Sequence, residues 1–153
     1  MKLYLVRHGD ALTPDVDPER RLSAAGHRQV DRMAAFLAGR GVHVVRVLHS
    51  GKPRAQETAA TMAAVVAPAT APEARGGLSP NDPVEPLAAE IADWREDSLI
   101  AGHLPHLARL ATLLLTGRNL PSGLDFEPAA AACLDRGEDG AWSLVWFVGP
   151  SLL

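Results

Sequence analysis

Arg7, His8 and Gly9 follow one another directly after a short apolar run, and together they could bind and transfer a phosphoryl group. The arginine fork suits phosphate oxygens, and a neutral imidazole can act as a nucleophile. Glycine lets the backbone turn sharply beside a ligand. Three residues alone are weak evidence, because an ordinary solvated Arg–His pair can also end a strand.

Two further segments carry residues suited to the same chemistry. In SGKPRAQET (50–58), Arg54 falls in the first turn of an expected helix, where free backbone N–H groups already favour an anion. In AGHLPHL (101–107), His103 precedes a proline-started helix and can donate to a phosphoryl oxygen. The plain alternatives are a surface arginine and a structural histidine. His106 is expected behind the site or at the surface.

The elements that must position these residues alternate between strands and helices. Strands are expected at 2–7, 42–50 and 97–103, in a terminal hairpin around 138–140, and once more, briefly, within the loop 67–86. Helices are expected at 53–66, 84–94 and 105–116, and from an N-cap at Ser23 to a stop at Gly39 and Gly41. The alternation predicts an α/β fold: a three-layer α/β/α sandwich with a largely parallel central sheet and antiparallel edge strands.

Ligands of such sheets bind beyond the carboxyl ends of the strands. His8 follows the first strand, Ser50 and Arg54 follow the second, and His103 ends the third. We therefore expect these polar residues to meet at one edge of the sheet.

Length and composition fit a single domain spanning 1–153, with 47% apolar and 22% charged residues. A net charge of −3 argues against a nucleic-acid partner. Cys133 is the one cysteine, so no internal disulfide can form, and a buried structural thiol is expected. The apolar stretch 107–115 is too short to span a bilayer. We expect a cytoplasmic protein without a membrane partner, and nothing demands more than a monomer.

The order of these motifs resembles the histidine phosphatase superfamily, and the resemblance covers nearly the whole chain. It rests on RHG after the first strand, SxxxRA after the second, GH after a later strand, and LSAAGHRQ at the start of the first helix. The resemblance implies a phosphoglycerate mutase-like fold in which His8 attacks phosphorus and carries the phosphoryl group. Arg7, Arg54 and His103 would hold its oxygens, and water would then hydrolyse the phosphohistidine. No metal or cofactor is implied, because the cationic side chains supply the charge.

Within that superfamily the chain resembles the SixA-type phosphohistidine phosphatases. The opening RHGDA, the spacing to Arg20, the sequence His103-Leu104-Pro105 and the segment LSPNDP carry this likeness. It implies a phosphorylated histidine-containing phosphotransfer protein as the partner, with Gly9, Arg20 and Leu104 helping to bind phosphate or partner. Arg20 could equally be a solvated loop arginine.

Larger relatives use an acidic side chain to protonate the leaving oxygen. The corresponding segment here reads GGLSPND, with Ser79 and Pro80 where an acid is expected. An alkoxide leaving group needs a general acid, whereas an imidazole needs less help, so the missing acid fits a phosphohistidine substrate. Glu73, Asp82 and Asp10 remain possible donors.

Three other functions stay open at the level of the sequence. One is a phosphomonoesterase of the same fold that acts on a small phosphorylated metabolite, and another is a non-catalytic module that binds phosphorylated ligands. The third is a zinc hydrolase using His103 and His106, although the chain has neither HExxH nor a carboxylate cluster.

Overall fold

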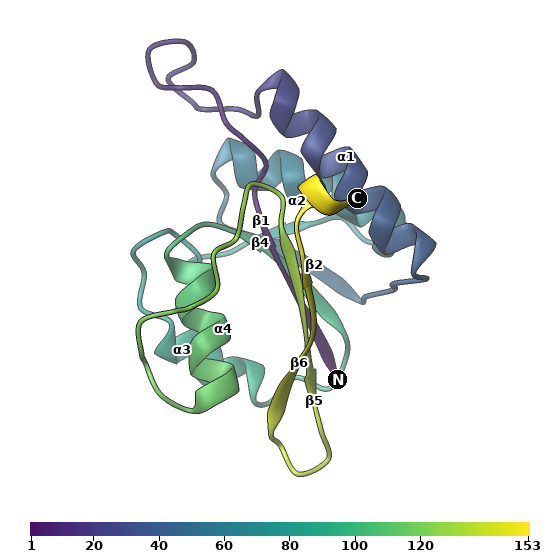
Figure 1. Ribbon diagram of the computed structural model, residues 1–153, viewed down its shortest axis with the longest axis vertical. Helices are drawn as coiled ribbons and strands as arrows, with labels where there is room; N and C mark the ends of the chain where they lie inside the picture. The colour runs from purple at the N-terminus through teal and green to yellow at the C-terminus, as the bar shows by residue number, and fades with distance from the viewer.

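The computed structural model describes all of residues 1–153 and contains one six-stranded sheet (Figure 1). Its strands are β1 (Lys2–Arg7), β2 (Arg46–His49), β3 (Glu73–Ala74), β4 (Ser98–Gly102), β5 (Ala131–Arg136) and β6 (Trp142–Val148). They lie in the order β3-β2-β4-β1-β5-β6. The first four are parallel, whereas β5 pairs antiparallel with β1 and β6 antiparallel with β5. The predicted largely parallel sheet with antiparallel strands at one edge is confirmed.

Helices cover both faces of this sheet and complete the three layers (Figure 1). Helices α1 (Ala24–Gly39) and α2 (Pro53–Val66) pack on one face, and α3 (Glu85–Ile91) and α4 (His106–Thr116) pack on the other. Side chains alternate along β1 as a strand requires: Tyr4 points to the α1/α2 face, whereas Leu5 points to the α3/α4 face. A short 3-10 turn, Pro150–Leu152, ends the chain beside α1. No helix combines the length and the apolar character needed to cross a bilayer.

Helix α1 begins and ends where its sequence signals predict. The Ser23 side chain accepts a hydrogen bond from the Gly26 backbone at 3.0 Å, which satisfies a free donor of the first turn. After Gly39 the chain leaves the helix, and Gly41 adopts a positive φ of 65° that favours glycine. Helix α2 also begins at Pro53 and ends at Val66 as predicted, because proline loses nothing in the first turn.

Strand β2 is shorter than predicted, covering four of the residues expected at 42–50. The β-branched residues before Arg46, which suggested a longer strand, instead belong to a connecting segment whose side chains pack into the core. Val42 and Val44 are buried against α1 and α2, and the Val44 N–H bonds to the carbonyl of Val66 rather than to a strand. The Val45 N–H likewise donates to the carbonyl of Asp97.

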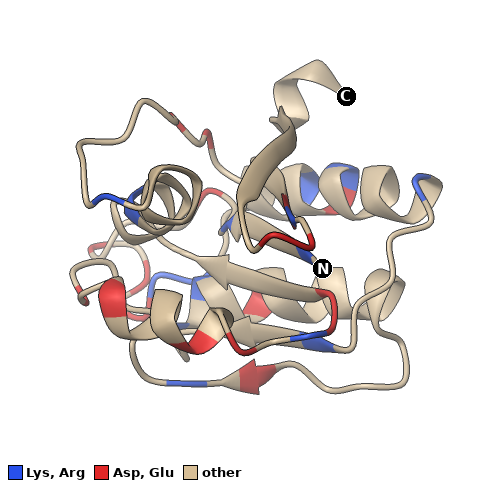
Figure 2. Ribbon diagram, turned by 90° about the horizontal axis from the view of Figure 1, so that it is seen from below, with Lys and Arg blue, Asp and Glu red and all other residues tan.

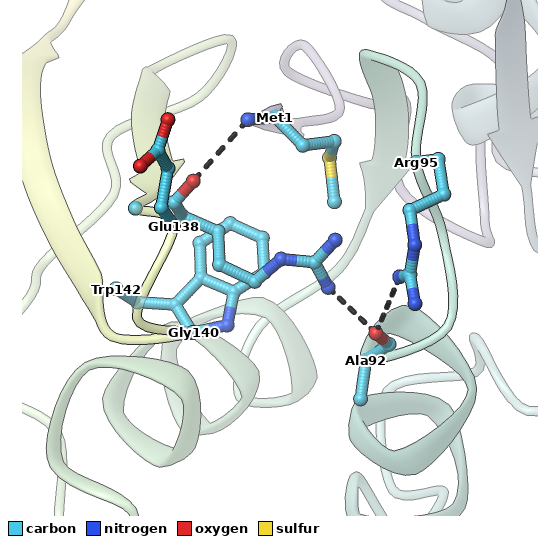
Figure 3. A pocket seen from close by; sticks show the side chains of 8 residues that line it. Met1, Ala92, Arg95, Glu138, Gly140 and Trp142 are labelled. Carbon is cyan, nitrogen blue, oxygen red and sulfur yellow. Dashed lines mark hydrogen bonds between the residues drawn. The ribbon is translucent and has the colours of Figure 1, made fainter.

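Helix α3 is also shorter than the predicted 84–94, and a side chain from β5 caps its carboxyl end. The Arg136 guanidinium donates to the carbonyls of Ile91, Ala92 and Trp94, which satisfies acceptors at and beyond the end of the helix. Arg136 lines a cavity of about 540 Å³ together with Met1 and Arg95. Figure 3 shows Arg95 donating to the Ala92 carbonyl at this cavity. The cavity lies at the start of β1, opposite the edge where His8 lies.

The terminal hairpin forms as predicted, with its turn at Gly140, whose φ is 83°. Cys133 on β5 is 1% exposed, and burial raises the pKa of its thiol to about 11, as expected of a structural cysteine. Acidic and basic positions are interspersed along the ribbon (Figure 2), which accords with the small net charge of −3.

Candidate active site

The strand pairing brings His8 and His103 together at the carboxyl edge of the sheet. Strands β1 and β4 are neighbours, with Arg7 opposite Gly102, and the His8 N–H donates to the Gly102 carbonyl at 3.0 Å. The two imidazole rings lie 5.0 Å apart between centroids. We call Arg7, His8, Arg54 and His103 the His8 cluster. The structure brings these four predicted residues to one place from three different strand ends.

Two hydrogen bonds orient the His8 ring. Its Nδ1 lies 2.7 Å from the Gly9 carbonyl oxygen, which can only accept, so Nδ1 carries the proton. Arg54 Nε donates to His8 Nε2 across 3.3 Å, so Nε2 keeps its lone pair. Burial is the main reason that the pKa of His8 falls to about 4, and Arg54 and Arg7 lower it further. The ring is therefore neutral at pH 7, with Nε2 free to attack an electrophile.

The two arginines of the cluster are held by different partners: Arg7 by a backbone carbonyl and Arg54 by the His8 ring. Arg7 Nη1 donates to the Phe126 carbonyl at 2.6 Å, which fixes the guanidinium beside β1. Burial lowers the pKa of Arg7, and the carboxylates of Asp125 and Asp10 oppose that shift. Arg54 stands in the first turn of α2, where unpaired backbone N–H groups favour an anion. The pair can grip an oxyanion from two sides.

His103 is 1% exposed, and its Nε2 lies 2.6 Å from the Ser50 hydroxyl. That hydroxyl also accepts from the Lys52 N–H at 3.3 Å, which leaves the serine proton free to point at the imidazole. Burial, then the charges of His8 and Arg54, lower the pKa of His103 to about 3. His103 is thus neutral at pH 7.

Thr58 supports the turn at Gly9 and was not among the residues predicted from sequence. Its hydroxyl accepts from the Gly9 N–H at 3.2 Å and donates to the Arg54 carbonyl at 2.8 Å. A Cβ at Gly9 would lie 2.7 Å from the Gly26 carbonyl oxygen, so this position has no room for a side chain. Thr58 lies four residues after Arg54, so both residues lie on the same face of α2. This spacing was the one signal in the sequence that could have identified Thr58.

Of the other predicted binding residues, Arg20 lies near the cluster. Its charge helps to lower the pKa of both His8 and Arg54, although it is not hydrogen bonded to either. Its Nε donates to the Leu12 carbonyl at 3.1 Å. Leu104 is half-buried against the core under α4. The structure therefore brings Arg20 into electrostatic reach of His8 and places Leu104 in a packing position.

The three carboxylates considered as proton donors are either bonded elsewhere or exposed. The Asp10 carboxylate accepts from the Ser23 hydroxyl at 2.6 Å, and the Asp82 carboxylate accepts from the Ser79 N–H at 2.9 Å. Glu73 is exposed on β3. None of the three is hydrogen bonded to the His8 cluster. Asp125, which sequence reasoning did not consider, lies near enough to affect Arg7.

His106 does not lie at the surface, and that part of its prediction is wrong. It is 0% exposed, because the first turn of α4 packs inward, and burial lowers its pKa. Neither ring nitrogen has a hydrogen-bond partner. No group of three or more His, Cys, Asp or Glu side chains is placed to hold a metal ion, so a zinc hydrolase would lack a ligand set here.

Comparison with known proteins agrees with this geometry. The sequence model of the histidine phosphatase superfamily (branch 1) matches residues 3–78, the half of the chain that contains Arg7, His8 and Arg54. Phosphohistidine phosphatase SixA of Escherichia coli K12 is 28% identical over 98% of this chain and 94% of its own length. The chain belongs to the histidine phosphatase superfamily. As a member of that family it is a phosphohydrolase.

Solved structures of the family extend the likeness to the whole fold. The structure of the protein histidine phosphatase SixA complexed with tungstate has a TM-score of 0.87 and 27% identity, over 99% of both chains. The α-ribazole phosphatase of Shigella flexneri has a TM-score of 0.79 at 17% identity, over 98% of this chain and 97% of its own. The second comparison shows that the fold is shared with a phosphatase of a different named substrate.

The depressed histidine pKa values predict that stability falls as the pH drops below about 6.5. Above pH 6.5 the imidazole rings are neutral in both the folded and the unfolded chain. Below it the unfolded chain takes up protons first, because the folded pKa values of His8 and His103 are about 4 and about 3. Each of these two histidines then lowers the free energy of unfolding by up to about 1.4 kcal/mol per pH unit. Buried His49 and His106 act in the same direction.

Urea unfolding at pH 8, 6.5 and 5 measures this loss. The expected result is a plateau between pH 8 and 6.5 and a fall toward pH 5. In His103→Gln the free energy of unfolding should fall less steeply below pH 6.5, because one of the histidines with a depressed pKa has been removed. A free energy of unfolding that stays constant from pH 8 to pH 5 would contradict the prediction.

Proposed function

We propose that this phosphohydrolase removes the phosphoryl group from phosphohistidine on a partner protein, through a covalent intermediate on His8. The observation that carries the proposal is the orientation of the His8 ring. The Gly9 carbonyl binds Nδ1–H, so the unprotonated Nε2 faces Arg54. A neutral imidazole with a free, directed lone pair is the form that attacks phosphorus.

The reaction follows in two balanced steps. His8 Nε2 attacks phosphorus, the bond from phosphorus to the substrate imidazole breaks, and the departing ring takes a proton from solvent. Water then attacks the phosphohistidine, releases inorganic phosphate and returns His8 to its neutral form. Arg7 and Arg54 neutralise the equatorial oxygens, and His103 takes a proton from solvent as negative charge arrives beside it and returns that proton to solvent when phosphate leaves. Phosphoryl transfer depends mainly on such positioning and charge stabilisation.

The leaving group supports a phosphohistidine substrate. An imidazole leaves with little help, whereas an alkoxide needs a positioned acid. The carboxylates weighed for that task are engaged elsewhere, Asp10 with Ser23 and Asp82 with Ser79. The likeness to phosphohistidine phosphatase SixA over 98% of this chain supports the same substrate class. SixA in complex with tungstate also supports an oxyanion as the ligand of the His8 cluster.

A second candidate is a phosphatase of small phosphate monoesters. The shared fold of the α-ribazole phosphatase favours it, and so does Asp125 beside Arg7, which is a carboxylate close to the cluster. This candidate requires a general acid, and Asp125 or Asp10 would have to turn toward the leaving oxygen in the complex.

A competition between substrates separates the two candidates. The wild-type protein is assayed with a phosphorylated histidine-containing phosphotransfer domain and with a panel of sugar, nucleoside and serine phosphates. We expect kcat/KM for the phosphoprotein to exceed that for every monoester by at least about a hundredfold, because a monoester lacks the benefit of a positioned general acid here. Faster turnover of a monoester would overturn the substrate assignment and direct the search to Asp125.

A further inference from the structure

The segment 10–21 projects from the body of the protein at the edge where His8 lies (Figure 1). It leaves β1 directly after Gly9 and returns to the start of α1. Arg20, at the base of this segment, acts electrostatically on His8 and Arg54, whereas the projecting tip has no role in the proposed mechanism. We call residues 13–17 the loop tip.

Hydrogen bonds at its base hold the segment in a defined shape. Ala11 and Leu22 form an isolated antiparallel bridge, and the Leu12 N–H donates to the Arg21 carbonyl at 2.8 Å. The Asp17 carboxylate accepts from the Glu19 and Arg21 N–H groups at 3.2 and 3.0 Å. The tip is therefore presented in a preformed position, which lowers the entropy that a partner must overcome on binding.

The same segment reaches the phosphate site at its base. Arg20 adopts a positive φ of 51°, and its Nε donates to the Leu12 carbonyl, across the loop. From there its charge acts on His8 and Arg54. A substrate whose phosphoryl group occupies the His8 cluster therefore lies at the foot of the loop.

The tip offers an apolar contact beside an unpaired negative charge. Val16 is 67% exposed, among the most exposed large apolar side chains in the chain. Asp17 and Glu19 are both paired with Arg21, whereas the neighbouring Asp15 has no cationic partner and is fully exposed. An apolar group beside a carboxylate that lacks a cationic partner matches a protein surface with an apolar residue next to a lysine or arginine.

We propose that the loop tip is a docking surface for the phosphohistidine-bearing protein, with Val16 and Asp15 as its contacts. The inference rests on the proposed function. Because the tip projects away from the His8 cluster, a substrate must extend well beyond its phosphoryl group to reach Val16. The tip would thus favour a protein over a free phosphorylated metabolite, without contacting the reacting atoms.

Two substrates with the same bond test this surface: a phosphorylated phosphotransfer domain and free phosphohistidine. Val16→Ser should lower kcat/KM for the domain on the order of tenfold, through KM, as loss of an interface anchor does. Its kcat/KM for free phosphohistidine should stay at the wild-type value. Asp15→Lys should also raise KM for the domain, and added salt should reduce the difference. Val145→Ser is the matched control, because Val145 is 51% exposed on the distant edge strand β6.

Wild-type KM for the domain in both loop variants would overturn the docking proposal and leave the proposed function intact. Equal losses on the domain and on free phosphohistidine would also overturn it, because the loop would then act on the His8 cluster itself. A wild-type protein that prefers monoesters to both phosphohistidine substrates would overturn the proposed function, and the docking proposal with it.

Discussion

Replacing His8 with alanine is expected to abolish turnover and formation of a phosphoenzyme. His8 Nε2 is unprotonated and faces Arg54, while the ring is fixed by the Gly9 carbonyl. Without it, no group remains to accept the phosphoryl group. The loss should be on the order of 10⁴ or more in kcat, as for removal of a covalent nucleophile elsewhere. Acid-quenched labelling with a ³²P-phosphorylated substrate measures the intermediate directly.

His43→Ala is the matched control for this variant. His43 is an exposed histidine beyond the C-terminal end of α1, whereas the N-terminal end of that helix packs against Gly9. It should keep wild-type turnover and labelling. Residual activity of His8→Ala within tenfold of wild type, in a protein of unchanged stability, would refute the covalent mechanism.

Replacing Arg54 with alanine is expected to cost about a hundredfold or more in kcat/KM. The Arg54 Nε lies 3.3 Å from His8 Nε2, so its guanidinium occupies the place where the oxygens of the phosphoryl group must pass. The variant also removes a bond that orients the nucleophile. Arg54→Lys should be intermediate, because lysine keeps the charge and loses the planar fork. Steady-state kcat and KM, with tungstate inhibition as a binding measure, separate the two losses.

Arg118→Ala provides the control for loss of an arginine. This residue is exposed after the C-terminal end of α4, whereas His103 precedes the N-terminal end. It should leave kcat/KM and tungstate inhibition unchanged. If Arg54→Ala turned over substrate at the wild-type rate, the oxyanion clamp would have to be assigned to Arg7 and Arg20 instead.

Local patterns in the sequence were enough to predict most elements and the four residues of the His8 cluster. The apolar run 2–7 and the proline-started helix 53–66 form as expected, because period and capping are properties of neighbouring residues. The position of each polar residue just after a strand predicted a common edge, because parallel strands end together. Burial of His106 could not be predicted, because the inward face of the first turn of α4 depends on what packs against it.

Only the tertiary structure determined how the cluster is held. The register of β1 against β4 places His8 beside His103, and these strands are about 90 residues apart in the sequence. The tautomer of His8 follows from its contacts with Gly9 and Arg54, and the pKa of His103 follows from burial. Local sequence patterns therefore predict which side chains reach the carboxyl edge of the sheet. Their distances, protonation and supporting contacts, such as the hydroxyl of Thr58, arise from groups distant in the chain, which no local period encodes.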